Sequence, residues 1–137
     1  MPWIFQDFVD SRGDNVIRPW LDSIPLKARL KIDSVLRHLR VQARFSYPVK
    51  KIHGYEGVFE IVIESFNVQY RPLGGYGRVV GEFVLVIGAI EQNDRIQPPD
   101  AFLTASKRIQ TVLDGTGRTC EHDYENKALC AGEEPER

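Results

Sequence analysis

The sequence predicts a small α+β domain in which helices pack against one twisted antiparallel sheet. Three observations support this prediction. Polar and apolar residues alternate in two segments, residues 59–64 and 67–72; an apolar run follows at residues 83–90; and apolar residues recur at helical spacing in residues 25–39 and 100–113. The 137 residues are enough for one domain with a single core and too few for two ordinary domains. We expect the order strand, helix, helix, three strands, helix (β-α-α-β-β-β-α).

The first part of the chain predicts one strand and two helices. Residues 3–8 alternate aromatic or aliphatic side chains with polar ones, which is typical of a strand. Asn15 is a good N-cap for a short helix, and Pro25 begins a longer helix that reaches about Leu39. The apolar positions at helical spacing are Val16, Trp20 and Ile24 in the first helix, and Ala28, Ile32, Val35, Leu36 and Leu39 in the second.

Residues 57–72 predict a β-hairpin with Ser65 and Phe66 as its turn. In that register, Glu60 lies directly opposite Arg71 on the polar face of the hairpin. A carboxylate and a guanidinium would therefore meet on an open sheet surface. Such a surface suits a site that handles phosphate, because the planar guanidinium matches the geometry of phosphate oxygens.

The last part of the chain predicts a buried strand, a helix and a tail. Residues 83–90 are apolar on both faces, as in a central strand. Asp100 can cap a last helix, which Gly115 or Gly117 ends. The apolar stripe of this helix consists of Phe102, Ala105, Ile109 and Val112. Residues 114–137 are acidic and lack apolar periodicity, so we expect a disordered tail after a domain of residues 1–113.

Charge is divided unevenly along the chain. The net charge is -1, but residues 114–137 hold seven acidic and three basic residues, which leaves residues 1–113 mildly cationic and able to bind RNA. Both cysteines, Cys120 and Cys130, lie in the acidic tail and match no standard zinc spacing, so we expect free thiols, no metal and no other cofactor. No apolar run is long enough to span a bilayer, and the N-terminus lacks the features of a signal peptide. We therefore expect a cytoplasmic protein with no membrane partner.

Five short motifs follow one another along the chain. They are Lys51-Ile52-x-Gly54, Gly57-Val58-Phe59-Glu60-Ile61, Tyr70-Arg71-Pro72-Leu73-Gly74, Phe83-Val84-Leu85-x-x-Gly88-Ala89-x-Glu91 and Ala105-x-x-Arg108. In this order and spacing they resemble the RelE/ParE superfamily of bacterial toxins, and most closely its HigB-like, phage-derived branch. The resemblance covers roughly residues 1–113, and the element order expected above agrees with the RelE-like fold.

The resemblance implies the toxin of a type II toxin-antitoxin pair, held inactive by an antitoxin that is typically a small helix-turn-helix protein. Many members of the superfamily cleave messenger RNA on the ribosome without a metal, whereas ParE-type members inhibit DNA gyrase and cut no RNA. We therefore expect a ribosome-associated mRNA endonuclease (an mRNA interferase). Two alternatives stay open: a ParE-like, non-enzymatic gyrase inhibitor, and an inactive phage-derived relative that acts by protein binding.

Three residues are candidates for catalysis. Metal-free RNA cleavage uses the 2′-hydroxyl of the substrate as nucleophile, so the protein must supply a proton acceptor, a proton donor and positive charge. Arg71 is the candidate for the charge, and the family places a site arginine on this strand. Glu60 is the candidate orienting group, because a neighbouring guanidinium makes a carboxylate a weak base; a plain cross-strand salt bridge is the alternative for this pair. His53 is the candidate for proton transfer, with an ordinary loop histidine as the alternative.

Six further residues are candidates for holding RNA. Lysines and arginines would contact backbone phosphates, and a tyrosine would stack on a base. The candidates are Lys50, Lys51, Tyr76, Arg78, Arg95 and Arg108. The chain departs from the family at Val62 and at Gln92-Asn93, where many members have basic residues. Expected cations are therefore missing at two places in the chain, which leaves catalysis weak, redistributed onto other basic residues, or absent.

Overall fold

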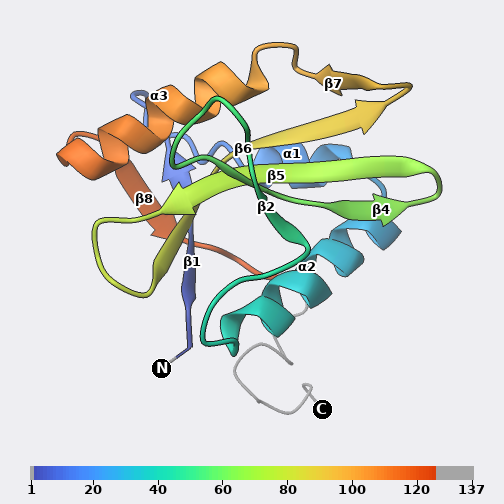
Figure 1. The fold of residues 1–137 in the computed structure, drawn as a ribbon, viewed down its shortest axis with the longest axis horizontal. Coiled ribbons are helices and arrows are strands. Elements are labelled where there is room, and N and C mark those ends of the chain that lie inside the picture. The colour runs from blue at the N-terminus through green and yellow to red at the C-terminus, as the bar shows by residue number, and fades with distance from the viewer. Residues whose placement is uncertain (1, 126–137) are drawn as a thin grey trace.

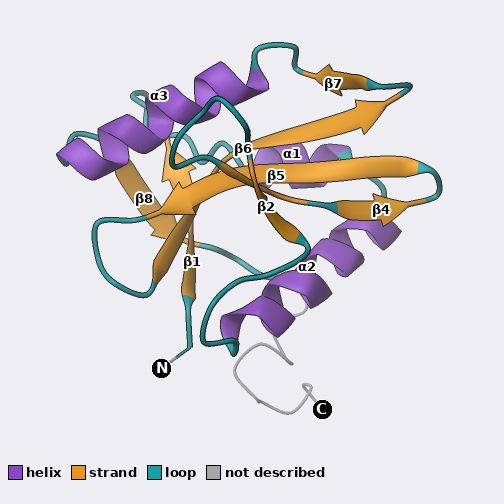
Figure 2. Ribbon diagram, in the orientation of Figure 1, coloured by secondary structure: helices purple, strands orange, loops and turns teal. Residues whose placement is uncertain are grey.

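Three helices lie against a mixed, eight-stranded sheet in residues 2–125, the part of the chain that the computed structural model describes (Figures 1 and 2). The class is therefore α+β, as the sequence predicts, but the predicted order β-α-α-β-β-β-α is wrong, because six strands lie between α2 and α3 and one more follows α3. The elements in chain order are β1 (Ile4–Val9), α1 (Arg18–Ser23), α2 (Leu26–Arg40), β2 (Val49–Lys51), β3 (Phe59–Ile61), β4 (Ile63–Ser65), β5 (Val68–Tyr76), β6 (Glu82–Gln92), β7 (Arg95–Gln97), α3 (Ala101–Asp114) and β8 (Arg118–Glu121).

The sheet has the strand order β2-β3-β5-β6-β1-β8, with β4 also paired to β5 and β7 to β6. Most neighbouring strands are antiparallel, but β1 runs parallel to β6. The prediction of a purely antiparallel sheet is therefore wrong at this one pair. Parallel neighbours need a long crossover connection, and here the helices and hairpins between β1 and β6 supply it.

The helices cover opposite faces of the sheet, and α2 and α3 bury most of the positions that the helical spacing predicts (Figure 2). The predicted stripe of the first helix is wrong in part, because Val16 and Trp20 are only half-buried and α1 buries Leu21 instead. On one face, Ile32 and Leu36 of α2 share a core with Tyr70 of β5. On the other face, Ala105 and Ile109 of α3 share a core with strand residues of β5 and β6. Within residues 2–125, no helix has both the length and the apolar character needed to cross a membrane.

The hairpin turn lies one residue later than the sequence predicts. Its two central residues are Phe66 and Asn67, which both have left-handed backbone angles (φ 51° and 65°). This two-residue turn matches the natural twist of antiparallel strands, and Asn tolerates the left-handed conformation well. The pairing therefore shifts by two positions, so Glu60 lies opposite Leu73 and the predicted direct pairing of Glu60 with Arg71 is wrong.

The polar C-terminal stretch is partly ordered, contrary to the prediction of a disordered tail from residue 114. Helix α3 ends at Asp114, and Gly115 follows in the left-handed conformation (φ 88°) that caps many helices. Strand β8 then pairs with the free edge of β1, which would otherwise leave backbone groups without partners. Beyond β8, the side chains of His122 and Tyr124 are buried, so this segment packs against the rest of the domain. Residues 126–137 of the predicted tail lie outside the described residues.

Position 88 in β6 has room only for glycine, because Trp20 of α1 packs directly against it. A Cβ atom added at Gly88 would lie 1.8 Å from Cδ2 of the Trp20 ring. We expect Gly88→Ala to lower the free energy of unfolding by about 2–3 kcal/mol, because the ring and α1 must move away from the sheet. Urea unfolding followed by tryptophan fluorescence measures this loss.

The matched control is Gly77→Ala, where the added Cβ would meet the side chain of Glu82 at 3.2 Å and Cγ2 of Val84 at 3.4 Å, with no contact as short as the one at Gly88. We expect a change well under about 1 kcal/mol for this variant. Equal unfolding midpoints for the two variants would contradict the packing of Trp20 on Gly88.

Candidate functional site

Four strands place a row of polar side chains on the sheet face that α3 partly covers. Lys50 of β2 pairs directly with Glu60 of β3. In the same way, Gln69 of β5 pairs with Glu91 of β6. Arg71 lies two residues after Gln69, so both side chains leave β5 on the same face. This row is called the polar row below.

Arg71 is the centre of the polar row. Its Nη1 donates to Oε1 of Glu60 at 2.8 Å, and its Nη2 lies 2.8 Å from Oε1 of Glu91. Its Nε also donates to Oε1 of Gln69 at 3.2 Å, and Nη2 contacts the same oxygen. The guanidinium is therefore oriented by two carboxylates and one amide from three strands.

The contact between Glu60 and Arg71 forms although the two residues are not direct partners. Since Glu60 lies opposite Leu73, Arg71 is its diagonal neighbour on the same face. A long arginine side chain spans that diagonal. The predicted contact is thus confirmed, and it is made through a different register from the predicted one.

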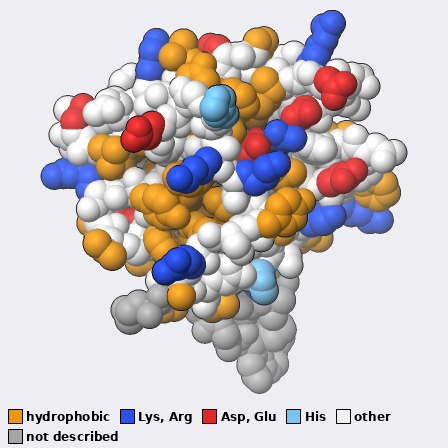
Figure 3. All heavy atoms as spheres, viewed as in Figure 1, with side chains coloured by type: hydrophobic (Ala, Val, Ile, Leu, Met, Phe, Trp, Pro, Cys, Tyr) orange, Lys and Arg blue, Asp and Glu red, His pale blue; other side chains and the backbone are white. Residues whose placement is uncertain are grey.

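Burial divides the polar row into an inner and an outer part. The side chains of Glu60 and Arg71 expose 7% and 16% of their surface, so this pair is largely shielded from water. Glu91 exposes 27%, and Lys50 is exposed. Because screening is weaker where water is excluded, the Glu60 contact holds the guanidinium more firmly than an exposed salt bridge would. Basic and acidic side chains lie next to one another near the middle of the face shown in Figure 3.

His53 lies in the loop after β2, outside the polar row. It is exposed and shares a shallow pocket with neighbouring loop residues, among them Lys51 and Glu56. Within residues 2–125, no hydrogen bond or ion pair joins His53 to Glu60 or Arg71. Lys51 pairs with Phe59, so it leaves β2 on the face opposite to Lys50. Of the two predicted lysines, only Lys50 belongs to the polar row.

Tyr76 lies at the far end of the β5–β6 pairing, opposite Phe83, and Arg78 lies just beyond it, so both are away from the polar row. Tyr76 packs in an aromatic cluster with Trp3, Phe45, Phe59 and Phe83, yet 41% of its surface stays exposed. Arg78 lies against the C-terminal end of α3, where a Cβ on Gly115 would come within 2.7 Å of its Nη1. A cation there complements the negative end of the helix dipole, which gives Arg78 a structural role.

Arg95 and Arg108 also differ in their surroundings. Arg95 is exposed on β7, where it pairs with Gln92. Arg108 instead donates from Nη1 to the carbonyl of Val86 at 2.7 Å and lies over the ring of Phe8. Desolvation by its neighbours lowers the pKa of Arg108, although it stays charged. Arg108 therefore stabilises the packing of α3, while Arg95 is free to meet a charged partner.

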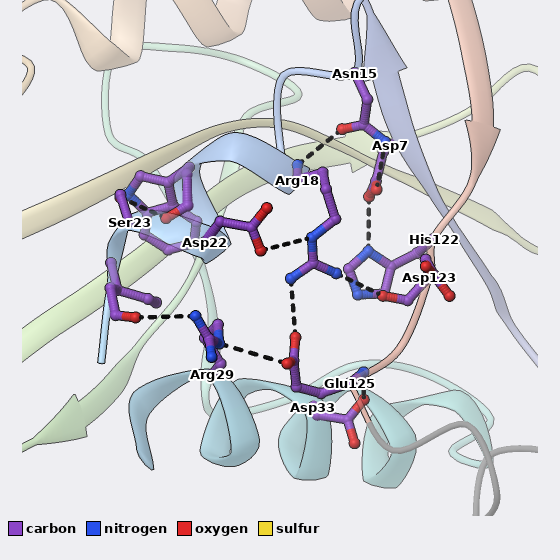
Figure 4. A network of polar contacts seen from close by, with 12 residues as sticks. Asp7, Asn15, Arg18, Asp22, Ser23, Arg29, Asp33, His122, Asp123 and Glu125 are labelled. Atoms are coloured by element: carbon purple, nitrogen blue, oxygen red, sulfur yellow. Dashed lines mark hydrogen bonds and ion pairs between the residues drawn. The ribbon is translucent and has the colours of Figure 1, made fainter. Parts of the chain in front are cut away.

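A second polar network was not predicted from the sequence, and it joins the C-terminal segment to β1 (Figure 4). Asp7 is buried, with 1% of its surface exposed. Its Oδ1 lies 2.8 Å from Nδ1 of the buried His122, and its Oδ2 accepts from the Asn15 amide at 3.0 Å. The amide oxygen Oδ1 of Asn15 accepts a hydrogen bond from the backbone N–H of Arg18 at 2.9 Å, at the start of α1.

The same network continues across the helices to Glu125 (Figure 4). Glu125 pairs with Nη2 of Arg18 at 2.8 Å and with Nε of Arg29 at 3.4 Å. Its backbone N–H donates to Asp33 at 3.0 Å. The only signal for this network in the sequence is the cluster of polar residues after β8, which also resembles a solvated tail. We call this network the C-terminal clamp.

Cys120 is a free, exposed thiol on β8. Partial desolvation, and then the charge of Asp7, raise the pKa of this thiol above its ordinary value, although a hydrogen bond from Asn15 opposes the shift. The thiolate is therefore disfavoured, which argues against a nucleophilic role. Within residues 2–125, no group of three or more His, Cys, Asp or Glu side chains is placed to hold a metal ion.

The chain matches no protein-family model, no curated protein and no solved structure. What can be inferred about its function therefore depends on its sequence motifs and on the geometry of the polar row.

Proposed function

We propose that the chain is the toxin of a type II toxin-antitoxin pair, of the RelE/HigB kind, and that it cleaves messenger RNA on the ribosome without a metal. The observation that carries the proposal is the oriented guanidinium of Arg71 on the polar row, held by Glu60 at 2.8 Å. The α+β class and the five motifs support the same family. Residues 1–113 hold fifteen basic and twelve acidic residues, a small excess that suits an RNA partner.

The proposed reaction needs no group beyond the protein and the RNA. The 2′-oxygen attacks the adjacent phosphorus and loses its proton to a base, while the bond from phosphorus to the 5′-oxygen breaks and that oxygen takes up a proton. The products are a 2′,3′-cyclic phosphate and a 5′-hydroxyl. Arg71 stabilises the charge that develops on the phosphate, Glu60 orients Arg71, and Lys50 binds the neighbouring backbone phosphate. His53 is the candidate proton carrier, brought to the RNA by movement of its exposed loop.

The proposed partners follow from this assignment. They are the ribosome with its messenger RNA and a cognate antitoxin of the helix-turn-helix kind. The exposed cations Lys50 and Arg95 are suited to an acidic segment of that antitoxin.

A ParE-like inhibitor of DNA gyrase is the second candidate. It is favoured by one observation, namely that the donors of Arg71 are already occupied by Glu60, Glu91 and Gln69. It is also consistent with the separation of His53 from the polar row. An inactive phage-derived relative would share both features.

A translation extract with a reporter mRNA tests the proposal. We expect the purified protein to cut the message, with 5′-hydroxyl ends that primer extension can map. An intact message combined with arrested growth in cells would contradict the nuclease. A supercoiling assay with purified gyrase then separates the ParE-like inhibitor, which blocks supercoiling, from an inactive relative, which does not.

A further inference from the structure

The two carboxylates on Arg71 are held very differently. Glu60 lies on β3, an inner strand between β2 and β5, and its side chain is 7% exposed. Glu91 lies near the end of β6, just before the turn at Asn93 and Asp94, and its side chain is 27% exposed. Water can therefore solvate Glu91 if it leaves Arg71, whereas Glu60 would remain desolvated and unpaired.

The two carboxylates bind to different nitrogen atoms of the guanidinium. Nη1 holds Glu60 and Nη2 holds Glu91, each at 2.8 Å. Carboxylates and phosphates bind to this fork with the same geometry. A phosphate that approaches from solvent therefore meets an edge of Arg71 that Glu91 and the amide oxygen of Gln69 already occupy, and of these two only Glu91 carries a charge that competes with the phosphate.

We propose that Glu91 is a built-in competitor for the phosphate-binding edge of Arg71, which a backbone phosphodiester of single-stranded RNA must displace before it can bind. This inference depends on the proposed function, because it assigns a regulatory role at the same site. Glu60 keeps the guanidinium in place during the exchange. Glu91 thus restrains the affinity for RNA, and it also repels any phosphate that binds next to it.

The test compares the affinities of four proteins, the wild type and the variants Glu91→Gln, Glu121→Gln and Arg71→Ala, for one uncleavable probe, a short single-stranded 2′-O-methyl RNA oligonucleotide, at fixed salt. We expect Glu91→Gln to bind this probe about tenfold more tightly than the wild type, since one competing charge-assisted contact is removed. The matched control is Glu121→Gln on the exposed edge strand β8, which removes the same charge away from Arg71. It should bind as the wild type does. A purely structural role for Glu91 cannot produce this gain in affinity.

The outcomes separate this inference from the proposed function. If Arg71→Ala abolishes RNA binding and Glu91→Gln binds no more tightly than the wild type, the competitor role fails and the RNA site stands. If both Glu→Gln variants gain equally, the effect is one of net charge and the competitor role also fails. If neither the wild type nor Glu91→Gln binds the probe, the proposed function and this inference fail together. Thermal unfolding of each variant confirms that it is folded.

Discussion

Replacing Arg71 with alanine should lower RNA cleavage by about 100- to 1000-fold, the loss seen when an oriented donor to transition-state charge is removed. Arg71 presents a planar fork that Glu60, Gln69 and Glu91 hold in one orientation. Without it, no other cation of the polar row can replace the fork, because Lys50 is a point charge on a flexible stem. Primer extension on the reporter mRNA measures the loss.

Two further variants make this result specific. Arg71→Lys keeps the charge and should still lose most of the activity, since an ammonium cannot contact two phosphate oxygens in the same plane. Arg12→Ala removes an arginine whose side chain is 84% exposed in the loop after β1, and it should cleave as the wild type does. Full activity in Arg71→Ala would exclude Arg71 from the chemistry.

Replacing Asp7 with alanine should have the largest effect on stability, a loss of about 3 kcal/mol or more in the free energy of unfolding. The change leaves Nδ1 of the buried His122 and the amide of Asn15 without their acceptor. It also loosens the C-terminal clamp, because His122 joins the segment after β8 to β1. Urea unfolding followed by circular dichroism measures the change.

Asp22→Ala is the control for this prediction. Asp22 forms an exposed ion pair with Arg18 at 3.3 Å, and its side chain is 64% exposed. We expect its loss to cost at most about 1 kcal/mol. If both substitutions lower stability by the same small amount, the buried Asp7–His122 pair does not hold the C-terminal segment to the sheet.

The helices were predictable from the sequence because their apolar spacing is local information. The stripes of α2 and α3 are buried where the spacing placed them, and Gly115 ends α3 as expected. The hairpin register was not predictable to the same degree. The turn is formed by Phe66 and Asn67, which both have left-handed backbone angles, and not by Ser65 and Phe66. A turn that lies one residue later shifts the pairing of the two strands by two positions.

The contact at the centre of the candidate site, between Glu60 and Arg71, was predictable from the sequence, but the residues around it were not. Glu60 and Arg71 share a face in both registers, because a shift of the pairing by two positions leaves every side chain on the same face of the sheet. Glu91 joins them only through the pairing of β5 with β6, which the hairpin alone does not determine. The C-terminal clamp joins residues more than 100 positions apart, so no local pattern could reveal it.

The most direct test of the account is the response of the Arg71 side chain to RNA. In NMR spectra, the Nε–H signal of Arg71 is identified by its loss in Arg71→Lys. The short 2′-O-methyl RNA oligonucleotide is then titrated into the wild-type protein. We predict that the Arg71 signal shifts progressively as the phosphate replaces Glu91, while the signal of Arg12 stays in place. An unchanged Arg71 signal, with RNA bound and other arginine signals shifted, would contradict the central claim that this guanidinium binds the phosphate.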